Sequence, residues 1–214
     1  MGTDVEKEKQ LAAQAAAALV ESGMRLGLGT GSTVAYLLPA LAQRRLALRC
    51  VATSPETEHA ARALGFTVEP FTLDHLDLAI DGADQISPEG WLVKGAGAAH
   101  TREKLVAVTA ERFVVIVDST KPVPALHPPV PLELMAFGLA STLSRLGQAC
   151  RRDVPPSPDG GVIADFTGPV GDPAVLAARL ASTPGVVDHG LFPPEMVTTI
   201  LVGRAESVER LEIR

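Results

Sequence analysis

Short apolar runs alternate with stretches of helical spacing along the first part of the chain. The runs are rich in Val, Leu and Ile, which is typical of buried strands, while the stretches between them repeat apolar residues with the period of a helix. Such alternation predicts βαβ units and therefore an α/β fold with a mostly parallel, Rossmann-like sheet. Strands are expected at 24–26, 49–52, 66–68, 76–80 and 113–118 and just before Lys94, and helices at 5–21, from Val34 to Leu41, at 55–65 and from Thr101 onward.

The pattern changes at 122–131, where five prolines make a stiff connection between two parts of the chain. Beyond it we expect two helices and three extended segments, at 138–146, 173–180, 162–166, 186–192 and 196–202. The last of these is long enough to return to the main sheet. We therefore expect an α/β domain made of 1–127 and 197–214, and a smaller α+β domain of ferredoxin-like type at 128–196.

The stretch 27–33, with the sequence Gly-Leu-Gly-Thr-Gly-Ser-Thr, lies between the first expected strand and the helix that follows it. Its glycines allow positive φ and a close approach of the backbone to a ligand. The free N–H groups at the start of the helix point into the turn, and the helix dipole favours an anion there. Because Thr30, Ser32 and Thr33 add hydroxyl donors, the stretch predicts an oxyanion site, with a phosphate as its natural ligand.

Two well-known phosphate loops do not match this stretch. The dinucleotide fingerprint requires a third glycine where this chain has Ser32, and an acid at the end of the next strand, where Thr53 and Ser54 stand. The nucleotide P-loop requires a Gly-Lys-Ser/Thr sequence, which does not follow. An ordinary tight turn without a ligand is an equal alternative for a glycine-rich stretch taken alone.

Two carboxylates, Asp81 and Asp84, flank Gly82 and Ala83 directly after the apolar run 76–80. Ligands of open α/β sheets bind beyond the carboxyl ends of the strands, which is also where the glycine-rich stretch is expected. The pair is therefore a candidate for acid–base chemistry. A solvated turn that uses Asp side chains for local hydrogen bonds is the simpler interpretation when the pair is taken alone.

Charged residues follow two further expected strands. Lys94 leads into the small residues 95–97 and suits a phosphate or another oxyanion, because it is a flexible point charge. Glu103 lies in the first turn of the next helix, where the dipole stabilises an ionised carboxylate and thus suits a base at neutral pH. The alternative for Glu103 is simple compensation of the helix dipole. Lys121 is a second candidate cationic contact, and its alternative is a solvated surface position.

The composition limits the expected partners. The chain has 214 residues and a formal net charge of −6, without a compensating basic cluster. Nucleic acid is not an expected partner, because affinity for it rests on neutralising phosphates. We expect no membrane association, because no apolar run approaches the roughly 20 residues that span a bilayer. Cys50 and Cys150 fit no metal or redox spacing, so we expect packing roles for both in a reducing, cytoplasmic environment.

Each motif is weak alone, but their order is specific. Over nearly its whole length the chain resembles the A-type family of ribose-5-phosphate isomerases. The resemblance is carried by 27–33, Asp81-Gly82-Ala83-Asp84, Lys94-Gly95-Ala96-Gly97, 101–104 and Lys121, and further on by 172–173, 184–187 and 190–192. It implies an aldose–ketose isomerase that interconverts ribose 5-phosphate and ribulose 5-phosphate in the pentose phosphate pathway, without a metal or an organic cofactor.

The resemblance also implies roles for individual residues. Glu103 would be the base that moves a proton between C2 and C1 through an enediolate, and Asp81 would assist ring opening and proton traffic at the hydroxyls. Lys94 and Asp84 would line the substrate oxygens. The substrate contacts implied in this way are Thr30, Gly31, Ser32, Thr33, Asp81, Gly82, Ala83, Asp84, Lys94, Gly95, Ala96, Gly97 and Lys121, with Lys9 as a candidate phosphate neighbour. Because the family is usually dimeric or larger, a homodimer or homotetramer is expected.

Some positions depart from the family pattern. Ala96 and Ala98 stand where the family usually has more glycines, and Ala136 stands where a proline is usual. If Ala96 or Ala98 needs a positive φ, its side chain strains the loop.

A hypothesis of a different class is a sugar-phosphate-sensing domain of a transcription regulator, which would bind its ligand without turnover. Against it, the chain shows no helix-turn-helix segment ahead of the domain, and it retains all four candidate catalytic residues. A nicotinamide-dependent dehydrogenase is disfavoured by the spacing of the glycines.

Overall fold

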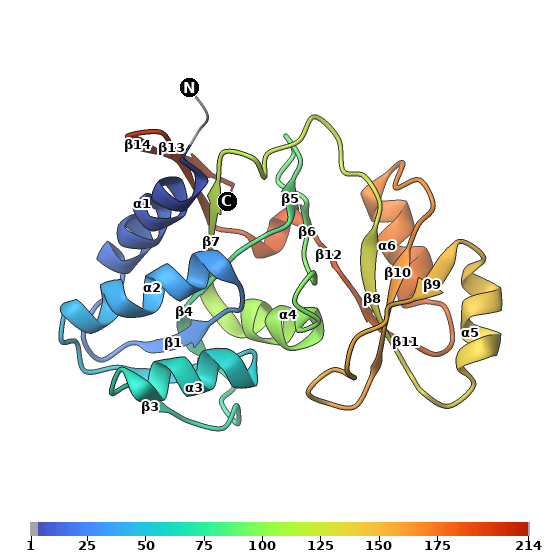
Figure 1. Cartoon of the computed structure of the whole chain (residues 1–214), viewed down its shortest axis with the longest axis horizontal. Helices are drawn as coiled ribbons and strands as arrows, with labels where there is room; N and C mark the ends of the chain where they lie inside the picture. Colours follow the sequence, from blue (N-terminus) through green and yellow to red (C-terminus); the bar gives the residue numbers. More distant parts are fainter. Residues whose placement is uncertain (1–3, 214) are drawn as a thin grey trace. The chain divides into compact units, whose positions relative to one another are not determined.

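The structure is a computed structural model that describes residues 4–213 (Figure 1). The chain divides into two compact units. The first unit combines the chain up to Ala83 with Arg102–Lys121 and with the chain from Pro194 onward, and the second combines Asp84–Thr101 with Pro122–Pro193. The domains expected from the sequence instead assign 84–101 and 122–127 to the first part and 194–196 to the second, and the position of the domain boundaries stays a prediction.

The first unit is built on a seven-stranded sheet with the order β14-β13-β7-β4-β1-β2-β3. Every neighbouring pair is parallel except β13 with β14. From β3 to β13 this is the order of a doubly wound, Rossmann-like sheet, and the direction of winding reverses between β1 and β4. The strands are β1 Arg25–Leu28, β2 Arg49–Ala52, β3 Thr67–Val68, β4 Leu76–Asp81, β7 Ala110–Asp118, β13 Thr199–Arg204 and β14 Ser207–Glu212.

Helices cover both faces of this sheet. Three of them, α1 Val5–Ala18, α2 Ser32–Gln43 and α3 Pro55–Ala63, share one apolar core with alternate strand residues such as Leu26 and Leu28. Gly27, between those two leucines, faces the opposite side because side chains alternate along a strand. There a Cβ at Gly27 would lie 2.4 Å from Cγ1 of Val106 in α4, His100–Thr109, so only glycine allows this close packing.

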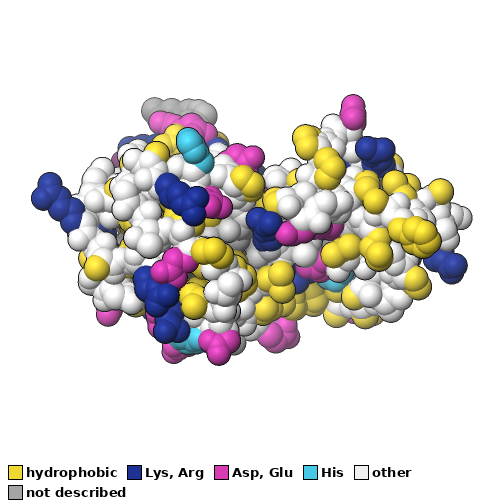
Figure 2. All heavy atoms as spheres, turned by 90° about the horizontal axis from the view of Figure 1, so that it is seen from below, with side chains coloured by type: hydrophobic (Ala, Val, Ile, Leu, Met, Phe, Trp, Pro, Cys, Tyr) yellow, Lys and Arg dark blue, Asp and Glu magenta, His cyan; other side chains and the backbone are white. Residues whose placement is uncertain are grey.

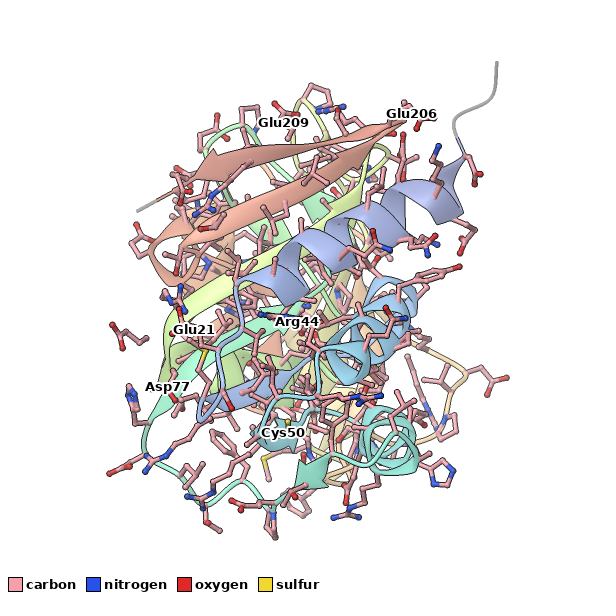
Figure 3. All side chains as sticks on the ribbon, turned by 90° about the vertical axis from the view of Figure 1, so that its left-hand side faces the viewer. Glu21, Arg44, Cys50, Asp77, Glu206 and Glu209 are labelled. Carbon is pink, nitrogen blue, oxygen red and sulfur yellow. The ribbon has the colours of Figure 1, made fainter. Side chains whose placement is uncertain are left out.

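Arg44 and Cys50 of the first unit have structural roles beside and within this core (Figure 3). Arg44, just after α2, donates from Nη1 to the carbonyl oxygens of Ala17 and Val20, the latter at 2.6 Å, and so caps the end of α1. Cys50 of β2 is 1% exposed, and burial raises the pKa of its thiol to about 12. The expected packing role is confirmed for Cys50. It is wrong for Cys150, which is exposed on the short edge strand β9, Ala149–Arg151.

The second unit contains an antiparallel four-stranded sheet with the order β11-β8-β10-β9. Together with its two helices the chain order is strand-helix-strand-strand-helix-strand, which confirms the ferredoxin-like prediction. A small three-stranded sheet, β12-β6-β5, belongs to the same unit. The elements are β5 Gln85–Ile86, β6 Leu92–Val93, β8 Val130–Leu134, α5 Leu139–Leu146, β9 Ala149–Arg151, β10 Val162–Phe166, α6 Pro173–Ala181, β11 Val186–His189 and β12 Leu191–Phe192.

The structure corrects several expectations. β8 lies partly within the segment expected to be a connection, and it is a central strand despite Pro131, which stands near its start, beyond the paired part of β11. The strand expected at 196–202 begins only at Thr199, after a short 3₁₀ helix at Pro194–Met196. It does not close the chain, because β14 follows it as an edge strand whose mostly exposed residues give no apolar alternation.

The surface agrees with the mixed charge of the sequence. On the face shown in Figure 2, acidic side chains lie among the basic ones, and apolar side chains are also exposed. None of the helices within residues 4–213 is both long and apolar enough to cross a membrane.

Candidate active site

The glycine-rich loop after β1 lies at the carboxyl end of the parallel sheet, beside the point where its winding reverses. Gly31 has φ 120°, in the region that favours glycine, and α2 starts directly after it without a side-chain cap. The first N–H groups of α2 therefore point into this turn, and an anion site here stays a prediction.

Neighbouring strands hold this loop in place. The backbone N–H of Gly29 donates to the carbonyl of Ile80 at 2.9 Å, and the Thr57 hydroxyl donates to the carbonyl of Gly29 at 2.8 Å. The hydroxyl oxygens of Thr30 and Thr53 are 2.8 Å apart. Thr53 and Thr57, at the end of β2 and in the first turn of α3, are loop supports that the sequence reasoning missed, because their role depends on the pairing of β1 with β2.

Asp81, the last residue of β4, is 3% exposed and faces the glycine-rich loop. Its Oδ1 accepts the N–H groups of Thr30 at 3.0 Å and of Gly82 at 2.7 Å. A Cβ at Gly29 would lie 2.0 Å from the Asp81 Cγ, so the carboxylate occupies the space that this glycine leaves free. The structure therefore brings Asp81 and the predicted anion loop into direct contact.

Glu103 lies in the first turn of α4, His100–Thr109, and is 5% exposed. Val106, one turn later on the same helix face, packs on Gly27 of β1. The end of α4 leads directly into the start of β7, so the start of α4 lies toward the carboxyl ends of the strands. Glu103 is thus placed at the same edge of the sheet as Asp81 and the glycine-rich loop.

The turn after β7 lies at the same edge of the sheet. Thr120 donates its backbone N–H to Oδ1 of Asp118 at 2.9 Å, and the N–H of Lys121 donates to the Asp118 carbonyl at 3.3 Å. This local turn brings the chain to Lys121 immediately after the strand end. Lys121 therefore lies at the edge where the sequence placed it.

Lys9 lies on α1, with its Nζ 2.7 Å from Oε1 of Glu6. The hydroxyl of Tyr36 in α2 donates to the other oxygen of Glu6 at 2.7 Å. The hydrogen bonds from Lys9 and Tyr36 lower the pKa of Glu6. Lys9 is therefore held near the first turns of α2 by an ion pair.

Glu8, which the sequence reasoning did not single out, is fully buried in α1. Its carboxylate accepts the backbone N–H groups of Ser119 at 3.0 Å and of Ala205 at 2.8 Å. Burial raises the pKa of this carboxyl, but the hydrogen bonds from Ala205 and Ser119 outweigh it and the pKa is lowered. A signal was present in the sequence, because Glu8 shares a helix face with the small apolar residues Ala12 and Ala16.

Asp84 and the loop after Lys94 come together in the second unit. The Asp84 N–H donates to the carbonyl of Val93 at 2.8 Å, and its Oδ2 accepts the N–H of Ala96 at 3.0 Å. Lys94 is 3% exposed, with its Nζ 5.5 Å from the centroid of the Phe192 ring. The backbone N–H of Lys94 donates to Gly190 at 2.8 Å. Residues 190–192 therefore pack against Lys94, although they lie far from it in the sequence.

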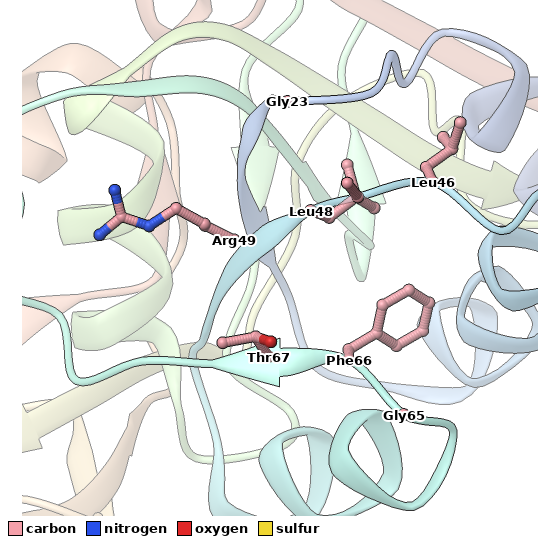
Figure 4. A pocket seen from close by; sticks show the side chains of 8 residues that line it. Gly23, Leu46, Leu48, Arg49, Gly65, Phe66 and Thr67 are labelled. Carbon is pink, nitrogen blue, oxygen red and sulfur yellow. The ribbon is translucent and has the colours of Figure 1, made fainter.

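A pocket of about 460 Å³ lies at the opposite edge of the sheet of the first unit (Figure 4). It is lined by Gly23, residues 46–49 and residues 65–67, at the amino ends of β1, β2 and β3. We assign it no function, because ligands of such sheets bind at the carboxyl ends. Its charged side chain, Arg49, is already paired with Glu69 at 2.8 Å. Among residues 4–213, no group of three or more His, Cys, Asp or Glu side chains is arranged to hold a metal ion.

Comparison with known proteins gives a consistent result. Residues 49–207 match the family model of ribose 5-phosphate isomerase A, also called phosphoriboisomerase A. The chain is 45% identical to ribose-5-phosphate isomerase A of Caulobacter vibrioides, with 97% of this chain and 98% of that protein covered. It is 41% identical to the protein of the same name from Gluconobacter oxydans, with 99% of each covered.

Solved structures agree with the sequence relatives. Ribose 5-phosphate isomerase A of Methanocaldococcus jannaschii superimposes with a TM-score of 0.91 at 31% identity, and 97% of this chain and 99% of that chain are covered. The enzyme of Neisseria gonorrhoeae gives a TM-score of 0.95 at 26% identity, with full coverage of both chains. The chain therefore belongs to the ribose 5-phosphate isomerase A family.

Proposed function

We propose that this protein interconverts D-ribose 5-phosphate and D-ribulose 5-phosphate through an enediolate. The observation that carries the proposal is a buried glutamate, Glu103, at the same sheet edge as Asp81 and a glycine-rich anion loop. A further relative, 32% identical with a TM-score of 0.91, is a D-ribose-5-phosphate isomerase in complex with phospho-erythronic acid. A sensing domain without turnover is not favoured, because relatives at 41% and 45% identity over nearly the whole chain carry the isomerase name.

The proposed proton transfer uses Glu103. In the direction from aldose to ketose, its carboxylate takes the proton from C2 of the open-chain sugar, and the electrons of that C–H bond form the enediolate. The same carboxyl group then returns the proton to C1, while the proton of the C2 hydroxyl moves to the oxygen on C1. A base must lie within hydrogen-bond reach of the carbon-bound proton, and general base catalysis typically contributes about 10²–10⁴-fold to the rate.

Asp81 is proposed to assist ring opening and the movement of hydroxyl protons. Its Oδ1 is already engaged by the N–H groups of Thr30 and Gly82, which fixes the orientation of the carboxylate beside the anion loop. A carboxylate held in one orientation is suited to accept and return a proton without reorganisation.

Lys94 and Asp84 are proposed to contact the substrate oxygens. A carbon next to a carbonyl is weakly acidic, so the enediolate needs preorganised positive charge near its oxygen, and a nearly buried ammonium group supplies it. Gly95, Ala96 and Gly97 are proposed as further substrate contacts, with the N–H of Ala96 already donating to Asp84.

The phosphate of the sugar is proposed to bind at the glycine-rich loop, through Thr30, Gly31, Ser32 and Thr33 and the start of α2. Lys121 would add a positive charge, and Lys9 is proposed as a further phosphate neighbour. Binding of a group remote from the reacting carbons holds the sugar in register for proton transfer. Gly82 and Ala83 are proposed as further substrate contacts.

We also propose a homodimer or homotetramer located in the cytoplasm. Support for self-association comes from large apolar side chains of the second unit that are exposed in the single chain: Met135 at 51%, Phe137 at 89% and Val187 at 49%. Exposed apolar side chains of this size are typical of protein contacts when they cluster. Sedimentation of the wild type and of Phe137→Ser measures whether this surface holds the copies together.

The test of the proposed reaction is incubation with ribose 5-phosphate in the presence of a metal chelator, following the ketose formed. We expect turnover by the wild type and a loss of about 10²–10⁴-fold in kcat for Glu103→Gln, because the amide keeps the shape but cannot act as a base. Glu56→Gln is the matched control, since Glu56 is also a first-turn glutamate but is exposed, in α3. An equally active Glu103→Gln would refute the assignment of the base, and an inactive wild type would refute the reaction.

A further inference from the structure

A partly buried ion pair of the second unit lies directly against the loop that follows Lys94. Arg152, just after β9, donates from Nε to Oδ2 of Asp165 in β10 at 3.0 Å and from Nη2 to Oδ1. The two side chains are only 20% and 18% exposed. The planar guanidinium is therefore held in one orientation by a bidentate carboxylate.

The remaining arm of Arg152 reaches the loop. Its Nη1 donates to the carbonyl oxygens of Gly95 and of Ala96, both at 3.1 Å. One charged group thus donates to two successive peptide carbonyls of the loop. The sequence does not predict these contacts, because Arg152 stands 57 positions after Gly95.

The direction of a carbonyl also sets the direction of an N–H group. A peptide unit is planar and trans, so its N–H points away from its C=O. The carbonyls of Gly95 and Ala96 turn toward Arg152, and the N–H groups of Ala96 and Gly97 therefore turn away from it. For Ala96 the result is visible, because its N–H donates to Oδ2 of Asp84 at 3.0 Å.

The loop is strained, so its peptide groups need such support. Gly95 has φ 113°, and a Cβ there would lie 2.7 Å from both Nδ1 of His100 and Cβ of Pro131. Ala98 has φ 58°, an unfavourable value for a residue with a side chain, and its N–H closes a tight turn onto the Gly95 carbonyl at 3.1 Å. A charged donor on the same carbonyl stabilises this conformation over others that the glycines would allow.

We propose that Arg152, backed by Asp165, is a positioning residue of the isomerase reaction. It holds the peptide groups at 95–97 so that the N–H groups of Ala96 and Gly97 face the Asp84 side of the loop. On this side the N–H of Ala96 orients the Asp84 carboxylate, and the N–H of Gly97 completes the donor set for the developing enediolate oxygen. The inference rests on the proposed function, because it assumes that the Lys94 loop binds the reacting end of the sugar.

The test compares Arg152→Met with Arg151→Met and the wild type. Methionine keeps much of the length of arginine but provides no donors, and Arg151 is an exposed neighbour on β9, which makes its variant the matched control. We expect Arg152→Met to lower kcat by about 10–10²-fold, because preorganised donors act mainly in the transition state, with a smaller change in KM. Arg151→Met stays within twofold of the wild type.

Inhibitor binding separates positioning from a merely structural role. Affinity for 4-phosphoerythronate, which carries a carboxylate at the end corresponding to the enediolate, falls by about the same factor as kcat/KM in Arg152→Met. Affinity for inorganic phosphate stays within twofold, because the phosphate loop belongs to the other unit. A parallel loss of both affinities would overturn the inference in favour of a general effect on folding.

Asp165→Asn provides the second variant, in case Arg152→Met does not fold. Asparagine keeps one acceptor for the guanidinium but loses the bidentate charge, so we expect the same split between the two affinities with a smaller loss. Unchanged kcat/KM in the folded Arg152 or Asp165 variant, beside an active wild type, would overturn the positioning role alone. An inactive wild type would overturn the proposed function, and the inference with it.

Discussion

Two loops of this protein are proposed to contact the substrate, and they are held in different ways. The loop at 29–33 continues a strand into a helix, and its partners lie at the ends of the two neighbouring strands, as Thr30 shows with Asp81 and Thr53. The loop at 94–98 is followed by α4 but is shaped by distant residues.

Those distant residues are Pro131, Arg152 and Gly190, which contact the second loop from three separate segments. A βα loop carries its own signal, because strand, glycines and helix start are consecutive in the sequence. A loop held by side chains from other elements carries no such signal until the fold is known. The first loop is therefore local in origin, while the second depends on tertiary contacts.

Among the variants that test this difference between the loops, Gly29→Ala in the first loop is expected to have the largest effect on kcat/KM. The new Cβ would lie 2.0 Å from the Asp81 Cγ, so the carboxylate must move. A shift of about 1 Å at a reacting group can cost about 10²-fold in rate, and we expect a loss of that size in kcat/KM.

Gly23→Ala is the control for Gly29→Ala. Gly23 has φ 93° and lies at the amino edge of the sheet, with nothing within 4 Å of a new Cβ. This variant should lose stability from backbone strain while keeping its kcat. A fully active Gly29→Ala would show that Asp81 does not need its observed position.

A smaller effect is expected from Glu8→Gln, which tests how the end of β7 is held. An amide oxygen can accept only one of the two N–H groups that Glu8 now accepts, from Ser119 and Ala205. Leaving a buried donor without its acceptor costs about 1–3 kcal/mol in the free energy of unfolding. Urea unfolding at pH 7 measures the loss, with the exposed Glu21→Gln as control.

The same variant predicts a dependence on pH. The folded-state pKa of Glu8 lies below its ordinary value of 4.5, so the charged form stabilises the fold above pH 4.5 and this stabilisation is lost as the pH falls through the lowered value. The difference between wild type and Glu8→Gln should be constant from pH 7 to about 5 and shrink at lower pH. A difference that does not change with pH would contradict this account.

The smallest effect is expected from Ala98→Gly in the second loop. A positive φ costs a residue with a Cβ about 1–2 kcal/mol, and the greater freedom of glycine in the unfolded chain offsets about 0.5–1 kcal/mol of the gain. We expect a net stabilisation of up to about 1 kcal/mol, measured by urea unfolding. Ala205→Gly, at φ 47° in the turn between β13 and β14, is the matched variant. A destabilised Ala98→Gly would mean that the loop is not strained there.

The contrast between the loops also explains what could be predicted from the sequence. The strands at 49–52 and 162–166 have the expected bounds. Asp81 directly follows the expected apolar run and Glu103 lies in the first turn of a helix, as the sequence predicted. These predictions rest on local patterns and on a general rule about parallel sheets.

Other features could not be predicted, for physical reasons. β8 was missed because its proline is typical of a connection, and only pairing with β10 and β11 makes it a strand. Glu8 and Arg152 were not recognised as supports because a charged residue shows its role only through partners far along the chain, Ser119 and Ala205 for one and Asp165 for the other. Ala98 was recognised as a departure, and the structure gives its positive φ.

The most direct test of the account is to follow the hydrogen at C2 with ribose 5-phosphate deuterated at that carbon. We predict that the wild type breaks the C2–D bond with a primary isotope effect, and that Glu103→Gln binds the sugar but labilises this deuteron at least about 10²-fold more slowly. Loss of the C2 deuteron at the wild-type rate in Glu103→Gln would contradict the claim that Glu103 carries the proton between C2 and C1.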